Sequence, residues 1–200
     1  MTLNPESPSP RATDHDAGPV RVILQADEIQ RALTRMSHQV TELAKGAQNL
    51  LVLGIPTRGV PLSRRLATEI GRIEGGQVPV GDLDITLYRD DLRRNPTRTA
   101  GRSLIPCPVE GRTVLLVDDV LNSGRTVLAA LDALKDIGRP DRVMLATLVD
   151  RGGRELPLQA DVVGLQIGTA KDERVAVHLV EHDGQDLVTI QRIPAAKGTR

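Results

Sequence analysis

Two adjacent carboxylates, Asp118 and Asp119, lie between an apolar run and a turn rich in small and hydroxyl residues. The run Val114 to Val117 is β-branched and leucine-rich, which is typical of a strand buried on both faces. The turn Asn122-Ser-Gly-Arg-Thr126 adds backbone N–H groups, hydroxyls and a helix start, which together favour an anion. Ligands of open α/β sheets bind beyond the carboxyl ends of the strands. The spacing therefore predicts a sugar-phosphate site: the carboxylates accept from ribose hydroxyls, and Asn122, Ser123, Gly124, Arg125 and Thr126 hold the 5-phosphate.

Other interpretations of this segment have less support. An Asp-Asp pair after a strand also occurs in receiver domains, and Ser-Gly is an ordinary turn. Here the strand lies in mid-chain, and the hydroxyl-glycine-basic-hydroxyl turn follows the acids within one loop length. Neither a Walker A pattern nor Gly-x-Gly-x-x-Gly is present, which argues against a P-loop or a dinucleotide-binding fold.

A second strand–turn–helix element contains Thr57, Arg58 and Gly59. It follows a predicted buried strand from Leu50 to Ile55 and precedes a helix predicted to begin near Pro61, a favourable first-turn proline. Taken alone, this is equally well a tight turn with a solvated arginine. Beside a sugar-phosphate loop, its backbone N–H groups and the Arg58 guanidinium favour a pyrophosphate loop.

The segment from Asp84 to Leu92 leads into a polar, basic and proline-bearing stretch over residues 89–110. A loop of that length inside a compact domain is usually functional, most often a lid. The plain interpretation is an edge strand followed by a solvated charged turn. The functional one is that Arg89, Arg93 and Arg94 approach a leaving pyrophosphate when the lid closes, which keeps water from an oxocarbenium-like transition state. Asp90 and Asp91 receive no assignment beyond a candidate Mg²⁺ contact.

The elements that position these segments predict an α/β fold with a mainly parallel sheet. The first helix is predicted over Asp27–Lys45, with Asp27 as N-cap and Gln30 in the capping-box position. Its apolar stripe comprises Ile29, Leu33, Met36, Val40 and Leu43, and its opposite face carries Arg31, Thr34, Arg35 and His38. Further strands are expected over 78–80, 84–88, 114–117 and 143–149, with a helix over 125–137 that completes a right-handed β-α-β unit. The ranges 161–167, 174–180 and 187–190 predict strands of a capping hood or antiparallel extension.

Composition limits the class of protein. The chain has 200 residues, formal net charge zero, one cysteine (Cys107), one tyrosine (Tyr88) and neither Trp nor Phe. Zero net charge leaves nucleic-acid binding to a local patch, and the lack of aromatics excludes base-stacking platforms. A single cysteine fits a reducing cytoplasm. Residues 1–20 predict a disordered tail and 191–200 a frayed end, on either side of one domain over 21–190, and no apolar run has membrane length.

Several motifs together resemble one group of type I phosphoribosyltransferases, the PyrR family of pyrimidine-operon attenuators with uracil phosphoribosyltransferase activity. The resemblance spans roughly residues 22–190. It is carried by Ala32-Leu-Thr-Arg35 with His38, Gly54-Ile-Pro-Thr-Arg-Gly59, Asp84-Ile-Thr-Leu-Tyr-Arg-Asp-Asp-Leu92, Val114 to Thr126, Gly138-Arg-Pro140, Leu148-Val-Asp-Arg-Gly152 and Arg154-Glu-Leu-Pro157.

The resemblance implies that phosphoribosyl pyrophosphate (PRPP) and uracil give UMP and pyrophosphate, with Mg²⁺ bound to PRPP and Asp118 and Asp119 as its candidate protein ligands. It implies a type I phosphoribosyltransferase fold with a small hood and a flexible lid loop. Val149 and Arg151 would face the base, beside the hood near 164–167. It also implies that a pyrimidine-operon mRNA leader binds when UMP or UTP is bound, at Thr34, Arg35 and His38, and that the chain forms a homodimer or higher oligomer. From the residues alone, Arg31, Arg35 and His38 share one side of the first helix, which is either an RNA-binding face or a solvated helix face.

The C-terminal half departs from the family pattern: Gly153 replaces a histidine, Gln159 a basic residue, Leu165 a lysine, and Gly168-Thr-Ala170 replaces Pro-Thr-Ser. Fewer phosphate contacts would weaken RNA binding and lower its salt dependence. Three functions therefore remain open: a bifunctional enzyme and attenuator, a uracil phosphoribosyltransferase without RNA binding, and a nucleotide-binding regulator with little catalysis. The residues predicted to bind the sugar phosphate do not contact the base, so a different nucleobase is also an alternative.

Overall fold

The computed structural model, which describes residues 18–89 and 103–193, contains a five-stranded parallel sheet in the order β3-β2-β4-β5-β6. The strands are β2 (Leu50–Gly54), β3 (Val80–Asp82), β4 (Thr113–Leu121), β5 (Arg142–Asp150) and β6 (Val162–Gln166). All five residues of β2 are buried, as is the apolar part of β4, because helices cover both faces of the sheet. The predicted α/β class with a mainly parallel sheet is confirmed.

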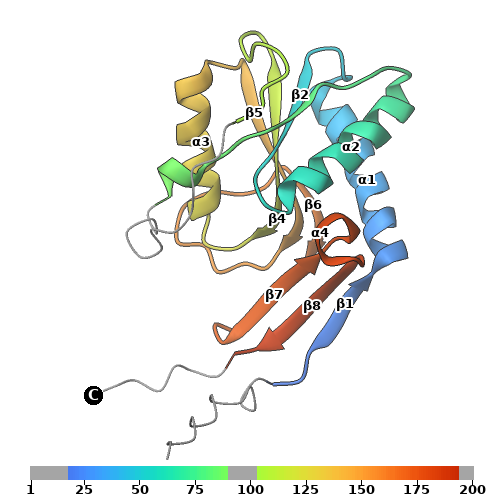
Figure 1. Cartoon of the computed structure of the whole chain (residues 1–200), viewed down its shortest axis with the longest axis vertical. Coiled ribbons are helices and arrows are strands. Elements are labelled where there is room, and N and C mark those ends of the chain that lie inside the picture. The colour runs from blue at the N-terminus through green and yellow to red at the C-terminus, as the bar shows by residue number, and fades with distance from the viewer. Residues whose placement is uncertain (1–17, 90–102, 194–200) are drawn as a thin grey trace, which may run out of the picture.

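Helices α1 (Ala26–Ala44) and α2 (Gly59–Glu74) cover one face of the sheet, and α3 (Arg125–Ile137) covers the other (Figure 1). Each face has its own apolar core. The first core joins Leu33 of α1 and Leu66 of α2 to Val117 of β4, and the second joins Leu134 of α3 to Leu116 of β4. The alternation along β4 thus divides its side chains between two cores, and the chemistry-bearing loops leave the sheet at its carboxyl edge.

A second, antiparallel sheet forms a hood at one end of the molecule, with strand order β1-β8-β7 (Figure 1). It comprises β1 (Arg21–Gln25), β7 (Glu173–His178) and β8 (Leu187–Arg192), with the short helix α4 (Val180–Asp183) between β7 and β8. The sequence analysis predicts no strand over residues 21–25, where the structure has β1. The assignment of 161–167 to the hood is wrong, because β6 pairs in parallel with β5. Gly164 permits this pairing: an added Cβ there would lie 2.5 Å from the Leu148 carbonyl oxygen.

The first helix begins earlier than its capping pattern suggests. Gln25 is its N-cap, and the backbone N–H of Gln25 donates to Glu28 Oε2 at 2.8 Å, so the predicted roles of Asp27 and Gln30 are wrong. Strand β1 runs directly into the helix and therefore sets its first residue. The predicted apolar stripe is buried up to Val40, whereas Leu43 is exposed.

Three other boundaries differ from expectation. Helix α2 begins at Gly59 and not near Pro61, and β3 covers 80–82 in place of 78–80. The predicted strand over 84–88 is wrong: Thr86–Tyr88 forms a turn of 3₁₀ helix. The Asp84 carboxylate accepts the Thr86 N–H at 2.8 Å, an arrangement that closes a turn and removes that N–H from strand pairing. At the C-terminal end, β8 includes residues 191 and 192 of the predicted frayed end.

Candidate active site

The acidic pair lies inside β4, three residues before its end, rather than after the strand. Asp118 is 6% exposed and Asp119 is half-buried. Each carboxylate is fixed by the next residue: the N–H of Asp119 donates to Asp118 Oδ1 and the N–H of Val120 donates to Asp119 Oδ1, both at 2.9 Å. The two side chains are thereby held as preformed acceptors at the carboxyl edge of the sheet.

Burial is the main cause that raises the pKa of the Asp118 carboxyl well above its ordinary value. Repulsion by Asp119 raises this pKa further, and the positive charge of Arg89 opposes both effects. A carboxylate held in this way costs folding free energy and gains from any ligand that supplies hydrogen-bond donors or positive charge. Arg89, which follows the 3₁₀ turn, is thus within electrostatic reach of Asp118, while its predicted approach to a leaving pyrophosphate stays a prediction.

The turn after β4 presents the amino terminus of α3. Gly124 is the N-cap residue with φ 92°, a left-handed conformation that favours glycine. A Cβ there would also lie 3.3 Å from Leu158 Cδ1. The first turn of a 13-residue helix therefore opens at Arg125 and Thr126, where backbone N–H groups and the helix dipole favour an anion; the Arg125 N–H also donates to Ser123 Oγ at 3.4 Å.

The loop from Ile55 to Gly59 packs directly on the acidic strand. The Ile55 N–H donates to the Val117 carbonyl at 2.9 Å, and a Cβ on Gly59 would collide with that same carbonyl oxygen. The Pro56–Thr57 peptide bond is cis, and Thr57 is exposed. The structure thus brings the two loops that the sequence pairs, Thr57–Gly59 and Asn122–Thr126, to the same edge around β4.

Arg58 is engaged with a carboxylate of the protein itself. Its Nε and second guanidinium nitrogen donate to Asp183 Oδ2 and Oδ1 at 3.1 and 2.7 Å. The hydrogen bond from Arg58 and the backbone N–H of Leu179 lower the pKa of the Asp183 carboxyl to about 2. Arg58 also experiences the charge of Asp119. Asp183, on α4 of the hood, was not a sequence candidate, because nothing in the local pattern distinguishes it from a surface acid.

The predicted base side receives mixed support. Arg151 follows β5, and its guanidinium donates to Thr169 Oγ1 at 2.9 Å and to the Ala170 carbonyl at 3.2 Å. Val149 has no exposed surface and packs in the first core, so the structure does not place it as a base contact. Leu148 and Val149 are both fully buried in this core, so simple alternation along β5 does not account for the position of Val149.

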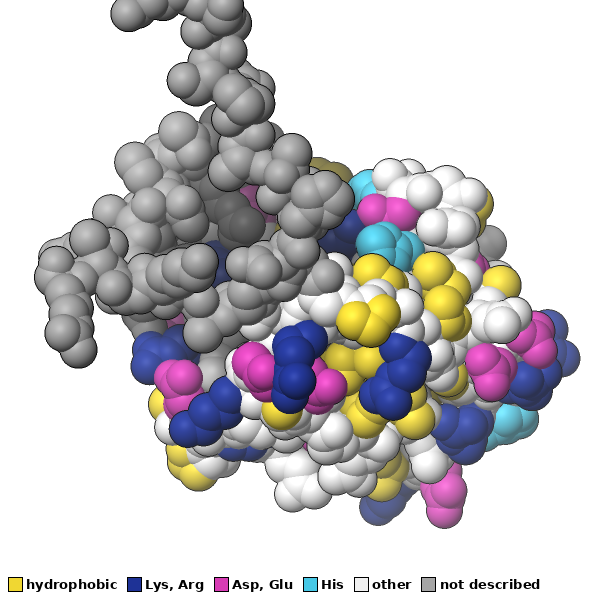
Figure 2. Space-filling view, turned by 90° about the horizontal axis from the view of Figure 1, so that it is seen from below, with side chains coloured by type: hydrophobic (Ala, Val, Ile, Leu, Met, Phe, Trp, Pro, Cys, Tyr) yellow, Lys and Arg dark blue, Asp and Glu magenta, His cyan; other side chains and the backbone are white. Residues whose placement is uncertain are grey.

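The polar face of α1 is present, although two of its arginines have partners. Arg31, Arg35 and His38 are exposed and Thr34 is half-buried. Arg31 pairs with Asp27 at 2.7 Å, and Arg35 donates to the Gly164 carbonyl of β6. Figure 2 shows the described surface seen from below, where basic and acidic side chains are interspersed rather than gathered by sign. Any RNA site must therefore be local.

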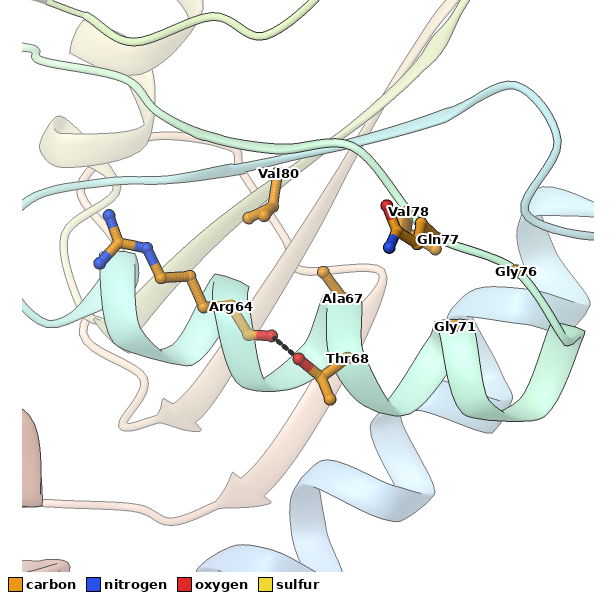
Figure 3. A pocket seen from close by; sticks show the side chains of 8 residues that line it. All are labelled: Arg64, Ala67, Thr68, Gly71, Gly76, Gln77, Val78 and Val80. Atoms are coloured by element: carbon orange, nitrogen blue, oxygen red, sulfur yellow. Dashed lines mark hydrogen bonds between the residues drawn. The ribbon is translucent and has the colours of Figure 1, made fainter.

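A cavity of about 370 Å³ lies away from this edge, between α2 and the segment that enters β3 (Figure 3). None of the predicted site residues lines it. Its Thr68 hydroxyl donates to the Arg64 carbonyl at 2.9 Å, and the Arg64 guanidinium pairs with Asp82. Because the Thr68 hydroxyl and the Arg64 guanidinium bind other groups of the protein, this cavity is a weaker candidate site than the carboxyl edge of the sheet.

Some expectations cannot be compared with the structure. Asp90, Asp91, Arg93 and Arg94 lie outside the described residues, as do most of the predicted lid and the first 17 positions. Within the described ranges, no group of three or more His, Cys, Asp or Glu side chains is arranged to hold a metal ion. Within the same ranges, no helix has the length and apolar content that a membrane crossing requires.

Comparison with known proteins agrees with this geometry. Residues 20–183 match the phosphoribosyl transferase domain family. The "Bifunctional protein PyrR" of Leifsonia xyli subsp. xyli is 57% identical over 176 residues, which cover 86% of this chain and 96% of the relative. The protein of the same name from Streptomyces coelicolor is 55% identical over 179 residues, covering 89% and 93%.

Solved structures share the fold at much lower identity. A hypoxanthine phosphoribosyltransferase from Staphylococcus aureus superimposes with a TM-score of 0.65 at 17% identity, covering 92% of this chain and 98% of that one. The Trypanosoma cruzi enzyme of the same name gives 0.65 at 17% identity, covering 86% and 97%. Similarity at this level concerns the architecture alone.

Proposed function

Because this chain belongs to the PyrR family of phosphoribosyltransferases, we propose that it forms UMP and pyrophosphate from PRPP and uracil and regulates pyrimidine-operon transcription by binding the mRNA leader. The observation that carries the enzymatic half is the packing of the Thr57–Gly59 loop against the strand that bears Asp118 and Asp119. One edge of the sheet then offers two anion-binding turns on either side of a pair of carboxylates. A ligand with a phosphate, a ribose and a pyrophosphate fits that order.

In this arrangement the turn Asn122–Thr126 holds the 5-phosphate, and Asp118 and Asp119 accept from the ribose hydroxyls. Thr57, Arg58 and Gly59 hold pyrophosphate. The bond between the sugar C1 and the pyrophosphate oxygen breaks, and a bond from C1 to the uracil nitrogen forms as that nitrogen loses its proton. The protein contributes mainly positioning and electrostatic stabilisation of the leaving group. Arg89 adds positive charge beside the acidic pair.

Mg²⁺ is the proposed cofactor. It usually binds through one or two carboxylates together with substrate phosphates, and Asp118 with Asp119 provides a donor set of that kind. When bound with PRPP, the ion would neutralise charge on the leaving pyrophosphate. The buried, mutually repelling carboxylates are consistent with a partner of positive charge.

Base specificity is the part of this proposal that most needs a test, because the carboxylates and the phosphate turn contact only the sugar phosphate. The alternative is a phosphoribosyltransferase for another nucleobase. Initial rates with PRPP and either uracil, hypoxanthine or orotate separate the two. We expect turnover with uracil alone; turnover confined to hypoxanthine or orotate would replace uracil in the proposal, and no turnover with any base would leave a regulator without catalysis.

For the RNA half, we place the leader on the polar face of α1, at Arg31, Thr34, Arg35 and His38. Support comes from the exposure of three of the four side chains and from the family resemblance. A gel-shift titration against a pyrimidine-operon leader, with and without UMP, tests it. We expect a UMP-dependent shift that Arg35→Ala with His38→Ala removes while UMP synthesis persists. A shift that the double variant leaves unchanged would move the RNA site elsewhere, and no shift would leave an enzyme without RNA binding.

Gly153 bears on this second role. It has φ 73°, next to Gly152 with φ 72°, so a histidine there would be strained or would require a different backbone. A cytoplasmic location, supported by the single cysteine, and a homo-oligomeric state complete the proposal.

A further inference from the structure

The segment from Asp150 to Leu158, here called the brace, lies behind the phosphate turn and contains a part-buried arginine. Arg154 is 23% exposed in its side chain and pairs with Asp150, 7% exposed, at 2.6 Å. The same guanidinium donates to the carbonyls of Asn122 at 2.9 Å and Leu158 at 3.0 Å, with longer bonds to those of Leu121 and Gly152. One side chain thus joins the end of β4, the turn and both halves of the brace.

Backbone groups of the brace complete this attachment. The N–H groups of Glu155 and Leu156 donate to the Ser123 carbonyl at 3.0 and 3.1 Å, and the N–H of Arg151 donates to the Leu121 carbonyl at 3.1 Å. Three consecutive carbonyls, those of Leu121, Asn122 and Ser123, therefore accept hydrogen bonds from the brace. A carbonyl oxygen directed at a phosphate would repel it, so holding these three on the brace keeps negative partial charge away from the anion.

The local sequence explains how Arg154 reaches the turn. Two glycines with positive φ, Gly152 and Gly153, follow β5 and precede Arg154. The backbone of Gly153 passes close to the Asn122 side chain, since a Cβ there would lie 2.7 Å from Asn122 Oδ1, and its φ of 73° favours glycine. Asp150 fixes this segment, since its Oδ1 accepts the Gly152 N–H at 3.0 Å while its Oδ2 accepts from Arg154.

We infer that Arg154 is a positioning residue for phosphoribosyl binding: it holds the carbonyls of the 5-phosphate turn outward, and Asp150 holds Arg154. Arginine suits this task because its rigid guanidinium reaches several acceptors at once, which the single ammonium of lysine does not. The inference rests on the proposed assignment of Asn122–Thr126 to the 5-phosphate.

The test compares KM for PRPP, KM for uracil and kcat in four variants of the full chain. Arg154→Gln and Asp150→Asn are each expected to raise KM for PRPP about tenfold through misplacement of the turn, with a smaller change for uracil. The double variant is expected to match the single ones, because contacting residues of one network are not additive. Arg142→Gln is the matched control: that arginine starts β5, also donates to a backbone carbonyl (Leu43), and is expected to leave all three constants unchanged.

Other outcomes overturn the inference. If Arg154→Gln lowers only the amount of active protein or kcat, with KM for PRPP unchanged, the arginine is merely structural. The milder Arg154→Lys provides the same comparison if Arg154→Gln does not fold. If the double variant raises KM for PRPP by the product of the two single effects, Asp150 does not act through Arg154 and is removed from the proposal.

Thr126→Val separates this inference from the proposed function. Its expected effect is a raised KM for PRPP, because a hydroxyl donor to the phosphate is lost. If Thr126→Val raises that KM and Arg154→Gln does not, the brace fails while the turn assignment stands. If neither does, the 5-phosphate lies elsewhere.

Discussion

The pyrophosphate loop and the phosphate turn follow the same strand–turn–helix plan, but they are held by different interactions. Arg58 of the pyrophosphate loop pairs with Asp183 of the hood, an opposite-charge contact that an anionic ligand is able to replace. The phosphate turn is held by three backbone carbonyls that donors of the brace engage. Under the proposed function, the loop that would release pyrophosphate has an exchangeable ion pair beside its backbone contact with β4, whereas the turn that would keep the 5-phosphate is held by backbone carbonyls.

The largest expected effect concerns the glycines of the two loops. Gly59→Ala should lower the free energy of unfolding by about 3 kcal/mol, because its Cβ has no space against the β4 backbone. Gly124→Ala should cost about 1–2 kcal/mol, the penalty of a left-handed conformation. Urea unfolding measures both. An equal or reversed order would mean that the pyrophosphate loop is not packed against β4 as tightly as the structure places it.

A smaller effect should come from the like-charge pair of β4. Burial and Asp119 raise the pKa of Asp118, so the ionised carboxyl costs stability at neutral pH. Asp118→Asn should therefore raise Tm without ligand by about 2–4 °C, the shift that 1 kcal/mol gives in a chain of this size. The gain should disappear as pH falls toward the ordinary aspartate pKa, where the carboxyl is neutral in both folded and unfolded chains. Asp132→Asn, at a half-buried site on α3 where the carboxylate pairs with Lys135 at 2.9 Å, is the control, and a Tm that falls in Asp118→Asn would contradict this account.

The smallest change in stability should come from the opposite charges of Arg58 and Asp183, at the hood. Its pH dependence should be the reverse of the one expected for Asp118. Asp183→Asn should lower the free energy of unfolding by about 1 kcal/mol or less, and by still less at high salt. The folded pKa of Asp183, about 2, lies below its unfolded value. The contribution is therefore present above the unfolded pKa and is lost as pH falls toward 2. Chemical unfolding at two salt concentrations measures it; a loss that salt does not reduce would show that the hood is held by packing and not by this pair.

The sequence predicts correctly those elements whose structure depends on residues close together in the chain. The run before Asp118 could only be a doubly buried strand, and Gly124 before a helical pattern marked the turn. The boundaries that failed depend on tertiary contacts: Gln25 caps α1 because β1 precedes it, and β6 joins the main sheet because Gly164 allows close approach.

The same distinction between local patterns and tertiary contacts applies to the site residues. Asp118, Asp119 and both anion-binding turns could be predicted because each lies within one short segment. Asp183 and Arg154 could not, because their partners lie 125 and 32 residues away in the sequence. Val149 was assigned from its place within the motif Leu148-Val-Asp-Arg-Gly152, and the motif does not reveal that this side chain is fully buried in the first core.

The most direct test of the central claim is the initial rate of UMP formation from PRPP, Mg²⁺ and uracil by Asp119→Asn, measured beside the wild type. If the β4 carboxylates hold the ribose between two phosphate-binding loops, the rate should fall about 10³-fold while the variant stays folded. A folded variant with a rate close to that of the wild type would show that the reaction takes place elsewhere.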